Sequence, residues 1–268
     1  MNILVYMCDN RPLLADLSLA DYNSMTACIN YIYCVRNGYD FLYSQCQYKD
    51  KQDDVFNCID PNSKTWRHAA WSRLIYTMDL IKNKNKYDYI VYIDSDCIFR
   101  NHDMRIEKYI ENHLDKDIVF INNNPWHLRL PCSGFYACKP NVCMGDFFKK
   151  WYEMDIVFKN NERYWEQDAL WLLIYNLPVK KIYLDKLHGN LLPTRIWPKN
   201  IGLIDDVMFF KRQGQYLTHI CGADAELRKP TFSKAIEINN IDFPTIIGEI
   251  NKKKFVLFDT STYYSKNN

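Results

Sequence analysis

The stretch YIVYIDSDCIF, residues 89–99, places two carboxylates, Asp94 and Asp96, directly after an apolar and aromatic run. A continuous run of this kind is typical of a strand that is buried on both faces of a sheet. Two ionised carboxylates at the end of such a strand repel each other and are costly to desolvate unless a cation or a set of donors compensates them. The stretch therefore predicts a positively charged partner at the end of a central strand.

The chain before this stretch alternates between strand and helix patterns. Short apolar runs are separated by segments in which apolar residues recur at helical spacing, and the pair Asn37-Gly38 ends the first of these segments. Repeated strand-helix-strand units predict a parallel sheet with right-handed crossover connections. The expected elements are strands at residues 3–7, 39–45 and 89–93 and helices at residues 17–36 and 66–82.

The rest of the chain continues the α/β pattern. We expect one α/β domain over residues 1–230, Rossmann-like, with a central, mostly parallel sheet flanked by helices. Residues 231–268 are expected to form a short C-terminal extension packed on the same domain. Ligands of open α/β sheets bind at the carboxyl ends of the strands, where Asp94 and Asp96 lie. The further expected elements are strands at 117–121, 134–139 and 181–185, helices at 144–158 and 165–175, and a terminal strand pair within 246–258.

Composition and charge exclude several classes of partner. The chain has 34 basic and 32 acidic residues, so its net charge of +2 gives no general attraction to nucleic acid or to an anionic membrane. No apolar run approaches the ~20 residues of a membrane span, and the N-terminal apolar run is too short for a signal peptide. Ten cysteines without a C-x-x-C pair and the absence of any N-x-S/T site favour a reduced, cytoplasmic protein. The spacing of Cys132, Cys138 and Cys143 fits no standard zinc motif.

A second D-x-D triplet serves as an internal control. Asp115-Lys116-Asp117 precedes an expected strand and therefore lies at the opposite end of the sheet, where a solvated turn is the simplest explanation. Asp94 and Asp96 follow a strand instead, and the spacing predicts that both side chains lie on one face of an extended segment, where they could hold a hard divalent cation. An acidic strand end that caps a neighbouring helix or pairs with an arginine is the competing explanation.

Four segments beside the acidic pair carry a resemblance to a known family. They are W-x-x-x-x-W-S-R-L (residues 66–74), SGFYACK (133–139), WEQDALWLL (165–173) and YLTHICG (216–222). With YDYIVYIDSDCIF they resemble the GT-A nucleotide-sugar glycosyltransferases, and in particular the α-galactosyl, α-xylosyl and α-mannosyl transferases. The resemblance covers residues 1–229. The eukaryotic members of that family have an N-terminal anchor, whereas this chain begins at its first strand.

The resemblance implies a metal site and a nucleotide-sugar donor. Asp94, Asp96 and His219 would bind Mn2+ or Mg2+, and this ligand set suits Mn2+ somewhat better. Asp94 and Ser95 would also contact the bound nucleotide, and Gly222 would let the backbone approach the diphosphate.

Other residues are candidates for the donor, for catalysis and for the acceptor. Lys229, with Arg228, would place a second cation on the diphosphate, unless both belong to a solvated turn. Asp168, with Glu166 beside it, would face the anomeric carbon, although helix capping would also place acidic residues there. The remaining candidates are Asp9 for the base and ribose, Arg73 for the diphosphate or donor sugar, and Asn124, Trp126, His127 and Gly134 for the wall of the acceptor or donor-sugar site.

The expected function is metal-dependent transfer of a hexose or pentose from a UDP-sugar, or from a GDP-sugar, to a glycan or other hydroxyl acceptor. The resemblance implies retention of configuration; in an inverting enzyme Asp168 would be the general base. Three alternatives remain. A binding protein of the same fold would bind the donor without turnover, a sugar-phosphate nucleotidyltransferase would need a glycine-rich loop that CDNRPLLAD lacks, and a metal nuclease would need a basic stripe.

Overall fold

The structure is a computed structural model of the 268-residue chain. It describes residues 1–45, 57–59, 66–83, 86–122, 131–154, 166–175, 201–204, 216–220 and 226–253.

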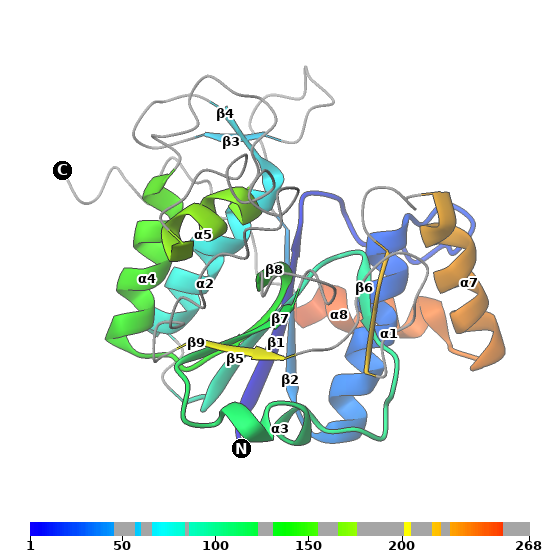
Figure 1. The fold of residues 1–268 in the computed structure, drawn as a ribbon. Coiled ribbons are helices and arrows are strands. Elements are labelled where there is room, and N and C mark those ends of the chain that lie inside the picture. The colour runs from blue at the N-terminus through cyan, green and yellow to red at the C-terminus, as the bar shows by residue number, and fades with distance from the viewer. Residues whose placement is uncertain are drawn as a thin grey trace, which may run out of the picture.

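One mixed sheet forms the centre of the molecule (Figure 1). The strand β8 is antiparallel to both of its neighbours, and all other pairings are parallel, so the expected mostly parallel sheet is confirmed. The carboxyl ends of five strands therefore meet at one edge. In spatial order the strands are β2 (Asp40–Gln45), β1 (Ile3–Asp9), β5 (Tyr89–Ile93), β8 (Pro131–Cys138), β7 (Ile118–Asn122) and β9 (Ile201–Ile204).

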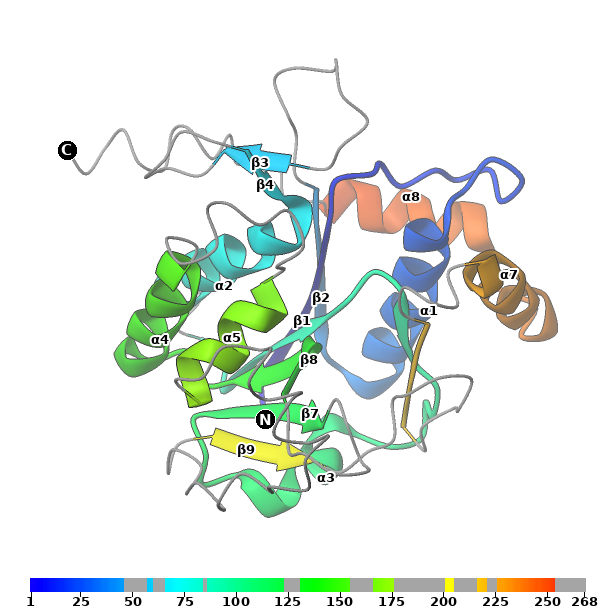
Figure 2. The same cartoon turned by 45° about the horizontal axis from the view of Figure 1, so that its top comes forward.

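Helices cover both faces of the sheet, as Figure 2 shows. On one face lie α1 (Tyr22–Asn37), α7 (Arg228–Ile238) and α8 (Phe243–Lys253). On the other lie α2 (Ser72–Asn83), α4 (Val142–Glu153) and α5 (Glu166–Tyr175). The remaining elements are the strand pairs β3 (Asn57–Ile59) with β4 (Trp66–His68) and β6 (Cys97–Phe99) with β10 (Leu217–His219), the helix α3 (Ile106–Tyr109), and the short 3-10 turns η1 (Ala69–Trp71) and η2 (Glu111–His113).

The two helical layers explain why the central strands read as unbroken apolar runs. All seven residues of β1 are buried. Its odd-numbered residues Ile3, Val5 and Met7 pack with α1, and the even-numbered Leu4 and Tyr6 pack with the other layer. A strand covered on both faces needs apolar side chains on both, as the sequence predicted.

The first helix ends where the sequence predicted and begins later. Gly38 has φ 74°, and the N–H groups that follow the helix bond to its last carbonyls, as in a glycine C-cap. The N-terminus lies at Tyr22 rather than residue 17, because the Asp21 carboxylate accepts a hydrogen bond from the first free N–H.

Two other sequence-based expectations about secondary structure were wrong. Residues 66–68 form a strand that pairs with β3, so the second helix begins only at Ser72. Residues 246–253 of the strand pair expected within 246–258 belong to α8, because Phe243, Ile247 and Ile250 lie on one helical face that packs into the core. Residues 254–258 lie outside the described residues. The strand expected at 181–185 lies outside the described residues.

The C-terminal helices pack against α1. Phe232, Ile236 and Phe243 belong to the same apolar cluster as β1 and α1. Helix α7 runs across residues 230 and 231, where the extension was expected to begin, and that division stays a prediction. None of the helices in the described part of the chain has the length and apolar character that crossing a bilayer requires.

Candidate functional site

The two aspartates lie in a turn that follows β5. The Cys97 N–H donates to the Asp94 carbonyl at 3.0 Å, and the Asp94 N–H donates to the Gly134 carbonyl at 2.9 Å. The expectation that residues 94–96 are extended is therefore wrong. The chain turns here because it leaves the main sheet for β6, which pairs with β10 instead.

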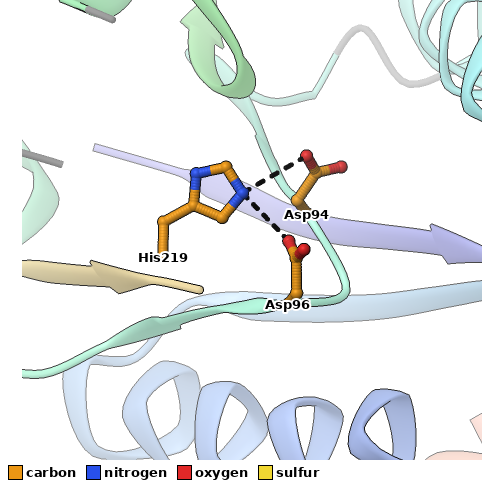
Figure 3. A group of neighbouring side chains, drawn as sticks. All are labelled: Asp94, Asp96 and His219. Atoms are coloured by element: carbon orange, nitrogen blue, oxygen red, sulfur yellow. Dashed lines mark ion pairs between the residues drawn. The ribbon is translucent and has the colours of Figure 1, made fainter. Parts of the chain in front are cut away.

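This turn and β10 bring three side chains together (Figure 3). His219 lies opposite Cys97 in the antiparallel β6–β10 pair. Its Nε2 is 3.0 Å from Asp96 Oδ1 and 3.8 Å from Asp94 Oδ2. One ligand atom from each of the three residues lies within 4.8 Å of the others, so the group could hold a metal ion. Two carboxylates and an imidazole suit a divalent cation such as Mn2+.

The electrostatics of this cluster follow from burial and from the charges packed around it. Burial raises the pKa of Asp94, and the Asp96 carboxylate adds to the rise. Burial also acts to raise the pKa of Asp96, but His219 and Arg228 outweigh it, so this pKa is lowered. Burial lowers the pKa of an imidazole, yet Asp96 and a hydrogen bond with Cys132 outweigh it, so the pKa of His219 is raised. The imidazolium thus supplies positive charge between the carboxylates, and a metal ligand would be the deprotonated ring.

Arg73 in α2 pairs with Asp94 of the cluster and with Glu166 in α5. Its Nη2 is 3.0 Å from Asp94 Oδ1 and 3.3 Å from Glu166 Oε1, and its Nη1 donates to the Ser133 carbonyl at 2.9 Å. The Ser133 hydroxyl donates to Glu166 at 2.9 Å. Arg73 is 6% exposed and Glu166 is 2% exposed. Glu166 therefore acts as a buried counter-ion of Arg73.

The two oxygens of Asp94 have different partners. Oδ1 accepts from the Tyr92 hydroxyl at 2.5 Å and pairs with Arg73, which leaves Oδ2 on the side of His219. Gly134 in β8 packs directly against this arrangement. A Cβ at Gly134 would lie 2.8 Å from His219 Cε1 and 2.9 Å from Asp94 Oδ2. Ordinary contacts of a Cβ are 3.4 Å or longer, so a side chain at this position would displace His219 or Asp94.

A pocket of about 290 Å3 opens at the carboxyl ends of β1 and β5. Its position agrees with the ligand edge of an open α/β sheet. Three carboxylates and three guanidinium groups are among the groups that line it. The lining residues are Cys8, Asp9, Asn10, Arg11, Tyr22, Ala70, Ser72, Arg73, Tyr92, Asp94, Ser95, Asp96 and Arg228.

Arg11 and Tyr22 are pocket residues that the sequence did not single out. Arg11 binds both oxygens of Asp9, with distances of 2.9 Å and 2.5 Å, and its guanidinium lies 3.9 Å from the centre of the Tyr22 ring. Arg228 donates to Asp96 Oδ2 at 2.6 Å and lies 4.7 Å from the same ring. The signal available in the sequence was an arginine two residues after Asp9, in the loop behind the first strand.

Apart from Glu166, the sequence candidates divide into three groups. Asp9, Arg73, Asp94, Ser95 and Asp96 line the pocket, and His219 and Gly134 lie beside it. Asp168 is half-buried in the first turn of α5 and is not among the lining residues, and Lys229 has a side chain that is 54% exposed, 3.9 Å from Asp21. Outside the described residues lie Asn124, Trp126, His127 and Gly222.

The control triplet lies at the opposite edge of the sheet. Asp117 immediately precedes β7, which runs parallel to β5, so the start of β7 is remote from the end of β5. Asp115 is exposed and pairs with Lys116. The two D-x-D triplets are thus separated as the strand order predicted.

Comparisons with solved structures identify the fold. No family model matches the sequence, and no curated protein sequence does. A glycosyltransferase involved in glycosylation of the major capsid of PBCV-1 aligns with 86% of this chain and 98% of its own, at TM-score 0.53 and 13% identity. The galactosyltransferase LgtC, solved with donor and acceptor sugar analogues, aligns with 87% of this chain and 95% of its own, at TM-score 0.42 and 12% identity.

The first of these similarities is one of overall fold. The described part of the chain has the GT-A glycosyltransferase fold, with a D-x-D turn and a histidine at the ligand edge of its sheet.

Proposed function

We propose that the protein is a metal-dependent glycosyltransferase that moves a hexose or pentose from a nucleotide-diphosphate sugar to a hydroxyl acceptor such as a glycan. The observation that carries the proposal is the grouping of Asp94, Asp96 and His219 beside the pocket. A divalent cation held there would act as a Lewis acid on the departing diphosphate. Mn2+ is the preferred ion and Mg2+ the second choice. A UDP-sugar is the preferred donor and a GDP-sugar the second.

The charges around the pocket support a phosphorylated ligand that binds together with a divalent cation. Arg11, Arg73 and Arg228 reach the lining, but carboxylates occupy all three, so the protein alone offers little net positive charge to a diphosphate. A divalent cation would supply the missing charge and would also screen Asp94 from Asp96. The positive charge that a diphosphate needs and the repulsion between Asp94 and Asp96 both support the binding of a metal together with a nucleotide.

The proposal assigns the remaining roles by position. Asp9 and Ser95 would contact the nucleoside, and Arg228 with Lys229 the diphosphate. Asp168 would support the developing positive charge at the anomeric carbon in a retaining reaction, or act as general base in an inverting one. Glu166 would act through Arg73, since Arg73 lies between Glu166 and Asp94.

The acceptor and the cellular location belong to the same proposal. Asn124, Trp126 and His127 would form the sugar-facing wall, and Gly222 would admit the diphosphate. A cytoplasmic location is supported by free thiols. Those of Cys8, Cys28, Cys34, Cys97, Cys132 and Cys138 are buried, and that of Cys143 is exposed.

Gly134→Ala is expected to weaken Mn2+ binding by roughly 10- to 100-fold, the range found when groups that orient metal ligands are changed. The reason is steric, since the new methyl group would push against His219 and Asp94. Electron paramagnetic resonance of free Mn2+ measures the affinity. The matched control is Gly248→Ala in α8, where a Cβ meets nothing within 4 Å. Equal Mn2+ affinities in the two variants would contradict the placement of the metal.

The experiment that tests the function is a donor panel. The purified protein is incubated with UDP- and GDP-sugars and Mn2+, with and without chelator, and released nucleotide diphosphate is quantified. Slow hydrolysis of one donor that stops with chelator supports the proposal and identifies the sugar. Donor binding without hydrolysis, with acceptors supplied, would indicate a binding protein of the same fold.

A further inference from the structure

Helix α1 carries a buried polar stripe on the side that faces the pocket loops. Asn23, Thr26 and Asn30 follow one another at spacings of three and four residues, so they lie on one face of the helix. All three are 0% exposed. Buried amides and hydroxyls destabilise a fold unless they are hydrogen-bonded, so the partners of this stripe indicate what it does.

Two of the three side chains bind the backbone of the segment that carries the aspartates. The Thr26 hydroxyl lies 2.7 Å from the Ser95 carbonyl, its nearest acceptor. The Asn30 amide donates to the Cys97 carbonyl at 2.9 Å and accepts from the Phe99 N–H at 2.9 Å. In Figure 3 a helix runs directly beneath the turn of Asp96, as these bonds to α1 require.

The Asn30 side chain takes the place of a neighbouring strand. Among the described strands, β6 pairs only with β10, along one edge. On its other edge, the amide of Asn30 presents one donor and one acceptor to Cys97 and Phe99, in the way that a peptide group of a paired strand would. β6 is therefore fixed from both sides immediately after the aspartates.

Asn23 extends the stripe to the other loop of the pocket. Its amide donates to the Pro12 carbonyl at 3.2 Å and to the Tyr43 hydroxyl at 2.8 Å. The loop at Pro12 follows Arg11, which lines the pocket and whose Nη2 lies 3.5 Å from the Ser95 hydroxyl of the aspartate turn. One helix face thus contacts the backbone of both loops.

We propose that Thr26 and Asn30 are positioning residues for the metal site, which hold the turn of Asp94 and Asp96 in its ligand-binding shape. The proposal rests on the proposed function and adds to it the elements that preorganise the site. The two side chains would contact neither metal nor donor, and they would act through the main chain at Ser95, Cys97 and Phe99, to which they are hydrogen-bonded. A ligand turn without such support would have to be ordered by the ion itself, which lowers affinity.

The test compares Thr26→Val with Thr26→Ser. Valine keeps the shape and the β-branched character of threonine but removes the hydroxyl donor, whereas serine keeps the donor. We expect Thr26→Val to bind Mn2+ about 10-fold more weakly and Thr26→Ser to bind it within about twofold of wild type. Asn30→Ala should weaken Mn2+ binding at least as much as Thr26→Val. If Asn30→Ala does not fold, the comparison of Thr26→Val with Thr26→Ser still tests the inference.

Asn37→Ala is the control on the same helix. Asn37 is also buried, and its amide donates to the His102 carbonyl at 3.1 Å, in a loop remote from the aspartates. This variant should lower the melting temperature while leaving Mn2+ affinity unchanged. If Thr26→Val lowers the melting temperature but not the affinity, Thr26 has a structural role only and the inference is overturned.

A measurement without metal separates this inference from the proposed function. Amide hydrogen exchange at residues 94–97 of the metal-free protein should be faster in Thr26→Val than in wild type and Thr26→Ser. If wild type binds no Mn2+, the proposed function fails, and exchange alone then decides whether α1 orders the turn. Unchanged exchange in Thr26→Val would overturn the inference even if wild type binds Mn2+ tightly.

Discussion

Asp96→Asn should lower the metal-dependent kcat/KM by about 10^3-fold, which corresponds to ~4 kcal/mol of transition-state stabilisation. Asp96 is the carboxylate nearest to His219, and its pKa is lowered by His219 and Arg228 even though burial opposes this, so it is charged at neutral pH. Asparagine has nearly the same shape but cannot supply that charge to a cation. The measurement is nucleotide diphosphate release at saturating Mn2+ with the donor that the panel identifies.

The chain contains its own control for this prediction. Asp115→Asn changes the same residue type in the second D-x-D triplet, where the carboxylate is exposed and pairs with Lys116. Its kcat/KM should stay within about twofold of wild type, since surface ion pairs contribute little. The metal assignment would be wrong if Asp96→Asn retained Mn2+-dependent turnover near the level of Asp115→Asn.

Arg73→Met should destabilise the fold by about 3–5 kcal/mol, the range for breaking a buried ion pair from one side. Arg73 compensates Asp94 and Glu166 at once, and its own side chain is 8% exposed. Methionine fills a similar volume without charge, so the loss reflects two carboxylates that no longer pair with the Arg73 guanidinium. Urea unfolding followed by tryptophan fluorescence gives the free energy of unfolding.

A double substitution and a substitution in an exposed ion pair test whether the loss comes from the carboxylates that Arg73 compensates. Arg73→Met combined with Glu166→Gln removes one of the two orphaned charges and should recover at least about 1 kcal/mol. Arg36→Met breaks the exposed pair with Asp103 and should cost less than about 1 kcal/mol. A loss in Arg73→Met as small as that in Arg36→Met would mean that water already screens the Arg73 network.

The sequence predicted the parts of the fold that depend on local signals. The apolar runs of β1 and β5 identify strands covered on both faces, and Asn37-Gly38 marks the end of α1. The position of Asp94 after a strand predicted the ligand edge of the sheet. The turn at the aspartates was not predicted, because it depends on the pairing of β6 with a segment far along the chain.

Long-range partners explain most of what the sequence could not give. Arg228 and Asp96 are 132 residues apart, and no local pattern links them. The histidine that joins the aspartates came from family resemblance, since an isolated histidine near a glycine has no spacing that identifies it. Thr26 and Asn30 were missed for another reason. They bond to backbone atoms, so their partners have no side-chain identity that a sequence can reveal.

The central claim is that a divalent cation and a nucleotide diphosphate bind together at Asp94, Asp96 and His219. Calorimetric titration of UDP into the purified protein tests it most directly, in Mn2+ and in chelator. We predict binding in Mn2+, its loss in chelator, and its loss in Asp96→Asn but not in Asp115→Asn. The account would be contradicted if neither UDP nor GDP bound in the presence of Mn2+, or if they bound equally well in chelator.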